Sequence, residues 1–114
     1  MRIITALNDL DKQHLDALAL PYSTDLERAV RAERLAMICA REAAWWGLLA
    51  RWSYLSGAVD AIHGRAALRA RSKCRGDARF WRDLAADWRA RAERRPTSDA
   101  AGALSNWREL GVTA

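Results

Sequence analysis

The stretch AAWWGLLARWSYL, residues 43–55, decides how this sequence folds. Its apolar residues point in nearly every direction around a helix that turns by about 100° per residue. A helix that is apolar on all sides is buried within its own fold, between subunits or in lipid. The charged residues Arg51 and Asp60 interrupt the apolar run, whereas a membrane-spanning helix needs about 20 largely uncharged residues. We therefore expect this segment to lie inside protein, with no membrane role.

The bulk composition is that of one globular domain. The chain has 114 residues, of which 51% are hydrophobic and 29% are charged. Cys39 and Cys74 are its two cysteines, too few for a disulfide framework, and its N-terminal residues do not resemble a secretory signal. These features predict a protein of a reducing compartment, and we expect it in the cytoplasm.

Nearly every segment has a helical pattern, because Ala, Leu, Arg and Glu dominate and period-2 alternation is scarce. The sequence predicts an all-α fold, with residues 1–114 forming a small bundle of about four helices. One long central helix is expected to be its spine. The predicted helices cover about 9–20, 24–63, 77–95 and 99–110, and the segment at about 64–76 is expected to be an exposed basic connector.

The long helix has a start signal and an apolar stripe. Thr24 and Glu27 have the spacing of a capping box, in which each side chain accepts a hydrogen bond from the other residue's backbone amide. Large and small apolar residues then share one narrow stripe over many turns, which favours a single helix. The stripe consists of Leu26, Val30, Met37, Ala44, Leu48, Leu55, Val59 and Ile62.

The positive charge is concentrated in one third of the chain. The net charge is +5, whereas residues 61–95 alone carry eleven basic and four acidic side chains. Helical spacing places one basic group on one face of a helix and a second group on another. The first group is Arg65, Arg69 and Lys73, and the second is Arg71 and Arg75, followed by Arg79 and Arg82. Such a patch can neutralise phosphates or an acidic protein, although a solvated basic connector is the simpler interpretation.

The aromatic content is the second unusual feature. Six Trp residues, two Tyr and one Phe are more than four short helices can easily bury. We expect Trp81 and Trp88 to pack against the Trp-rich end of the long helix. Trp and Arg are enriched at interaction hot spots, so Trp45, Trp46, Arg51 and Trp52 are candidate partner-binding residues. The surplus predicts that a second copy or a target protein covers part of this surface, and a homodimer is expected.

The sequence contains no signature of catalysis or cofactor binding. Asp60 and His63 stand three residues apart and could meet on one helix face, but no nucleophile can be placed beside them from spacing. The histidines and cysteines lack paired metal-ligand spacing, and the six glycines form no phosphate-binding loop. We expect no enzyme activity, no cofactor and no metal site.

These observations predict a non-enzymatic interaction protein. The 17 Arg and 24 Ala residues have GC-rich codons, which suggests a high-GC bacterium or one of its phages. A phage or mobile-element accessory protein that inhibits or sequesters a host protein or nucleoprotein complex, as anti-CRISPR proteins do, fits this character. The alternative is a nucleic-acid- or nucleotide-binding regulator that uses the basic residues of 64–95.

Overall fold

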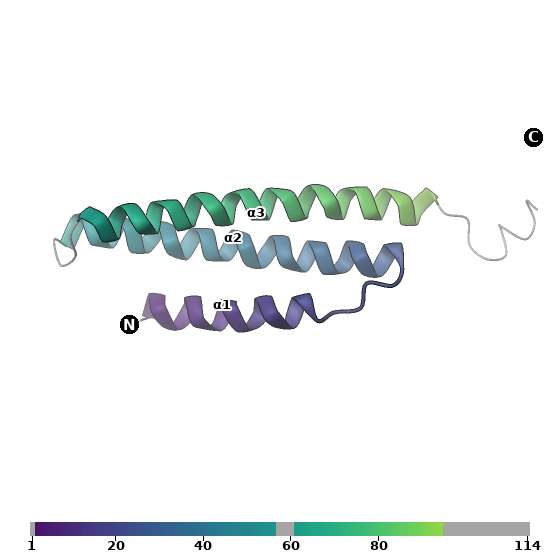
Figure 1. Ribbon diagram of the computed structural model, residues 1–114, viewed down its shortest axis with the longest axis horizontal. Helices are drawn as coiled ribbons and strands as arrows, with labels where there is room; N and C mark the ends of the chain where they lie inside the picture. The colour runs from purple at the N-terminus through teal and green to yellow at the C-terminus, as the bar shows by residue number, and fades with distance from the viewer. Residues whose placement is uncertain (1, 57–60, 95–114) are drawn as a thin grey trace, which may run out of the picture.

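The computed structural model describes residues 2–56 and 61–94, which form three α-helices. These are α1 (Arg2–Leu18), α2 (Asp25–Ser56) and α3 (Ala61–Arg94). Helix α2 lies between α1 and α3, and neighbouring helices run antiparallel (Figure 1). The predicted all-α class is confirmed. The helix expected over about 99–110 lies outside the described residues, so a count of four helices is not confirmed.

Helices α2 and α3 form a long antiparallel pair. With 32 and 34 residues, they are about 48 and 51 Å long at the usual rise per residue. A single helix over about 24–63 is not confirmed, because α2 ends at Ser56 and α3 begins at Ala61. The basic segment at about 64–76 was expected to be an exposed connector, but it forms the first part of α3, which continues through Gly76.

Small side chains make the contact between α2 and α3. The buried residues recur three, four or seven positions apart in each helix, the spacing of an antiparallel helix pair. They are Ala29, Ala32, Cys39, Ala43, Ala50 and Ser53 in α2, and Ala67, Cys74, Ala78 and Ala85 in α3. We call these residues the small-residue seam. The seam is buried only if the chain turns between the two helices, which is why two helices replace the single predicted one.

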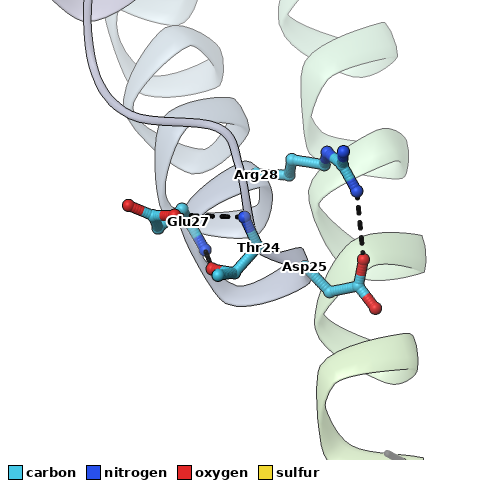
Figure 2. Close-up of polar contacts among 4 residues, drawn as sticks. All are labelled: Thr24, Asp25, Glu27 and Arg28. Carbon is cyan, nitrogen blue, oxygen red and sulfur yellow. Dashed lines mark hydrogen bonds and ion pairs between the residues drawn. The ribbon is translucent and has the colours of Figure 1, made fainter.

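The start of α2 confirms the predicted capping box. The backbone amide of Thr24 donates to Oε1 of Glu27 at 3.0 Å, and the amide of Glu27 donates to Oγ1 of Thr24 at 3.1 Å (Figure 2). Arg28 adds an ion pair to Asp25 at 3.3 Å. The paired bonds satisfy amides that the first turn of a helix otherwise leaves without partners.

Helix α1 packs on a second face of α2. Leu10 and Ala17 of α1 are buried against Leu35 and Ile38 of α2. The helix begins at Arg2, earlier than the predicted residue 9. It ends at Leu18, shortly before Pro21, whose ring disfavours helix continuation.

The predicted apolar stripe of α2 lies at the surface. Its large side chains are between 37% exposed, at Met37, and 75% exposed, at Leu55. Ile62 belongs to α3 and is also exposed, and Val59 lies outside the described residues. The reason is geometric: α3 packs on the small-residue face of α2, and α1 packs on the face with Leu35 and Ile38. The stripe occupies the third face.

Candidate functional site

A groove lined by arginines runs between α2 and α3. Its volume is about 860 Å³. Helix α2 contributes small or apolar residues and one cation, and α3 contributes four cations. The lining residues are Ala40, Ala43, Ala44, Gly47, Leu48 and Arg51 of α2, and Arg71, Arg75, Ala78, Arg79 and Arg82 of α3. We call this feature the arginine groove.

The arginine groove brings together five of the residues predicted to bind a partner. In α3 they stand three or four positions apart, from Arg71 to Arg82, so one side of the helix carries them over about 16 Å. Arg51 joins them from α2 because the two helices are antiparallel. Arg65, Arg69 and Lys73 are exposed elsewhere on α3 and do not line the groove. The structure thus separates the two basic groups.

Arg71 lies deepest among the groove cations. Its Nε atom is buried and has no hydrogen-bond partner. Gly47 leaves room for this side chain, since a Cβ atom at residue 47 would lie 3.2 Å from Cδ of Arg71. A buried polar group without a partner costs roughly 1–3 kcal/mol. An anion or carboxylate that reached Arg71 would remove that cost.

The five groove arginines form no ion pair within residues 2–56 and 61–94. Arginines outside the groove are engaged differently. Arg89 binds Glu33 at 2.7 Å. Arg31 donates from Nε to the carbonyl oxygen of Leu18 at 3.3 Å and lies over the rings of Tyr22 and Trp81. The groove therefore gathers five arginines for which the described residues provide no ion pair.

A second, shallower depression adjoins the arginine groove. Its volume is about 480 Å³, and its lining residues are Ile3, Leu48, Arg51, Trp52 and Leu55. We call it the apolar hollow. Leu48 and Arg51 line both features. The two therefore form one continuous surface, basic on one side and apolar on the other.

None of the tryptophans within the described residues is fully buried. Trp45 and Trp46 are half-buried, and Trp52 is 40% exposed. Trp107 lies outside the described residues. Of the three predicted partner-binding tryptophans, Trp52 lines the apolar hollow, whereas Trp45 packs against the core formed by α1 and α2.

The expectation that Trp81 and Trp88 both pack against the Trp-rich stretch needs correction. Trp81 packs against the core near Leu35 and Ile38, and Trp88 lies under Arg28, 4.7 Å from its guanidinium carbon. Trp88 therefore lies near the start of α2, whereas Trp81 packs against the same cluster as Trp45 of the Trp-rich stretch. The antiparallel pairing explains this arrangement, because the C-terminal half of α3 returns to the N-terminal half of α2.

A polar cluster occupies the middle of the three-helix layer. The Cys74 thiol donates to Oε2 of Glu42 at 3.5 Å, and Nδ1 of His14 lies 3.8 Å from the other carboxylate oxygen. Burial, followed by the charge of Glu42, raises the pKa of Cys39 to about 11 and that of Cys74 to about 12. Both thiols hold their protons at neutral pH, which makes them weak nucleophiles.

The pairing of Asp60 with His63 that was considered from the sequence stays untested. His63 is exposed, and Asp60 lies outside the described residues. Within the described part of the chain, no group of His, Cys, Asp and Glu side chains could hold a metal ion. No helix in that part is long and apolar enough to cross a membrane.

The small, uncharged residues on the α2 side of the groove were not predicted from the sequence, although Arg51 of α2 was. Gly47, Ala40 and Ala43 carry no charge and were not considered as binding residues. The signal that could have found them is the recurrence of small residues three and four positions apart in both halves of the chain. Comparisons with protein-family models, curated proteins and solved structures found no match to this chain.

Proposed function

We propose that this protein is a non-enzymatic interaction protein that holds an acidic partner protein in the arginine groove. One observation carries the proposal: five arginines from two helices line one groove and form no ion pair within the described residues. Buried Nε of Arg71 adds an unsatisfied donor. Charged groups gathered without partners provide both specificity and fast association with a surface of the opposite sign.

A protein partner is favoured over nucleic acid because half of the groove is uncharged. Ala40, Ala44 and Leu48 offer apolar contact. A nucleic-acid backbone binds proteins chiefly through its charged phosphates, so it would not make use of these apolar side chains. Nucleic acid remains the second candidate function, since the arginines of α3 follow one helix side at intervals that a strand of phosphates could match. The two candidate functions predict different ligands for the arginine groove: an acidic peptide if the partner is a protein, and a DNA duplex if the partner is nucleic acid.

The wider biological role is a proposal from composition alone. A phage or mobile-element protein that sequesters a host component, in the manner of anti-CRISPR proteins, would use such a groove to occupy an acidic surface of its target. Residence in the cytoplasm belongs to the same proposal. The homodimer predicted from the aromatic content stays a prediction.

The test compares two variants that change the net charge equally. Arg75→Glu with Arg79→Glu reverses two groove residues, and Arg65→Glu with Arg69→Glu reverses two exposed residues outside the groove. Each pair is four residues apart in α3. A labelled poly-glutamate peptide and a labelled DNA duplex are titrated with each protein, and binding is followed by fluorescence anisotropy at several salt concentrations.

We expect poly-glutamate to bind the wild type and the control variant alike, and the groove variant at least about 10-fold more weakly, equal to roughly 1.4 kcal/mol. Equal losses in both variants would show that net charge binds the peptide without the groove, and would refute the proposal. A DNA duplex that binds tightly, with a steep salt dependence, while the peptide does not bind would establish the nucleic-acid alternative instead.

A further inference from the structure

The third face of α2 continues the candidate site beyond the arginines. Met37, Leu48 and Leu55 are exposed on this face, and Ala44 lies between them at helical spacing. From residue 37 to residue 55 the stripe is about 27 Å long, or five helical turns. Within the described residues, neither α1 nor α3 covers it.

The stripe and the arginine groove overlap along the same part of α2. Ala44 and Leu48 belong to both, and Leu48 and Leu55 also line the apolar hollow. The combined surface is apolar along its length and basic along one edge. Among the residues that the structure describes, no carboxylate lines the groove or the hollow. A ligand that matched this surface would be apolar on one side, with acidic groups beside the apolar side.

We infer that the partner segment is an amphipathic α-helix with acidic residues along one flank of its apolar face, an inference that rests on the proposed function. A helix laid along a groove presents apolar residues three and four positions apart. That spacing suits the exposed stripe of α2, which has the same period. Glutamate or aspartate on the flank would reach the guanidinium groups of Arg71, Arg75 and Arg79, which line the groove.

Charge argues against a second copy of this chain as the occupant. In a symmetric dimer the same surface of each copy meets itself. Arg51, Arg75 and Arg79 of one protomer would then face the same cations of the other, and like charges brought together across an interface are unfavourable. An acidic helix from another protein has no such penalty.

The experiment uses three synthetic peptides, of which the first two have identical composition. One peptide places Leu at helical spacing with Glu along one flank, a second has the same residues in scrambled order, and a third replaces each Glu of the first with Lys. Binding to the full chain is measured by fluorescence anisotropy. The protein variants are Leu48→Gln with Leu55→Gln in the stripe, and Leu15→Gln, an equally exposed position on α1, as the control.

The amphipathic acidic peptide should bind at least tenfold more tightly than the scrambled peptide, and the Lys peptide should not bind. The stripe variant should remove this preference, whereas Leu15→Gln should retain it. Equal binding of both acidic peptides, lost in the Arg75→Glu and Arg79→Glu variant, would overturn the inference and leave the proposed function standing. Failure of both acidic peptides to bind would refute the two together.

Light scattering of the free protein tests whether a second copy of this chain occupies the stripe. We expect the mass of the free protein to be the same in the wild type and in the stripe variant, whatever its oligomeric state. A dimer that dissociates when Leu48 and Leu55 are replaced would show that a second copy occupies the stripe, and would overturn the inference.

Discussion

Gly47 and Arg71 contact each other across the two long helices, and this contact sets the position of the deepest groove cation. A Cβ atom at residue 47 would lie 3.2 Å from Cδ of Arg71, so Gly47→Ala should shift the arginine outward. Alanine also favours a helix over glycine by roughly 0.5–1 kcal/mol. We expect the variant to unfold no more readily than the wild type in urea. Its affinity for poly-glutamate should fall about threefold, or roughly 0.7 kcal/mol.

Gly76→Ala is the matched control for that substitution. Gly76 is exposed in α3, and a Cβ atom there would meet nothing within 4 Å. The variant should gain the full helix-propensity benefit of roughly 0.5–1 kcal/mol and bind the peptide like the wild type. Unchanged peptide affinity in both glycine variants would show that Arg71 takes no part in binding.

The two buried thiols provide a second test at the residue level. Their pKa values are raised to about 11 and about 12 from 9.0, so the native protein should react with iodoacetamide at pH 8 at least about 100-fold more slowly than the urea-unfolded chain. Mass spectrometry of quenched samples measures both rates. Rapid alkylation of the native protein would show that the thiols are accessible and ionised.

The same pKa values predict how stability changes with pH. A thiol whose pKa is higher in the folded state favours folding while it is protonated, so its contribution is complete below 9.0 and is lost as the pH rises toward about 11. The free energy of unfolding should therefore fall over this range. In the Cys39→Ala, Cys74→Ala double variant the fall should be smaller, because alanine has no thiol to ionise. The variant should still fold, since alanine already fills most of the small-residue seam.

At the level of elements, the pairing of α2 and α3 depends on residues too small to keep the helices apart. Ala67 is 1% exposed in the small-residue seam, whereas its neighbour Ala66 is exposed. Ala67→Leu should lower the free energy of unfolding by about 1–3 kcal/mol, the usual cost of overpacking. Ala66→Leu adds the same side chain to the same helix and should change stability by less than about 0.5 kcal/mol. Equal changes in the free energy of unfolding for the two variants, measured by chemical denaturation, would contradict the assignment of Ala67 to the small-residue seam.

The seam also explains which parts of the fold could be predicted from the sequence. The helical class and the capping box of Thr24 and Glu27 depend on neighbouring residues, so local patterns predicted them correctly. The hairpin depends on Ala, Cys and Ser side chains whose hydrophobicity is low. The larger residues Met37, Leu48 and Leu55 dominated the periodicity, and yet they lie at the surface.

The candidate site was predictable only in part for a related reason. Helical spacing alone separates Arg71, Arg75 and Arg79 from Arg65 and Arg69, and the structure places only the first group in the groove. That Arg51 and Gly47 belong to the same groove follows from the antiparallel pairing of two helices, which no local pattern contains.

At the scale of the whole molecule, the described residues 2–56 and 61–94 form a layer of three helices with a narrow core. The largest fully buried side chains are Leu35, Ile38 and Cys39, and no tryptophan within residues 2–56 and 61–94 is buried. A thin layer exposes much of its surface relative to its volume, which limits its stability. Grouping five arginines in one groove adds repulsion between like charges. We therefore expect the binding surface to lower the stability of the free protein.

That expectation can be tested by comparing stability with and without salt. At low ionic strength, the Arg75→Glu, Arg79→Glu variant should melt at a higher temperature than the wild type, because the repulsion is relieved. The difference should disappear near 1 M salt, where the screening length falls to about 3 Å. An acidic amphipathic peptide at 100 times its dissociation constant for the wild type should stabilise the wild type by about 2.7 kcal/mol, and the variant, which binds at least about 10-fold more weakly, by no more than about 1.4 kcal/mol. A wild type that is the more stable at low salt would mean that the groove arginines are already compensated, and the physical reason for an acidic partner would be lost.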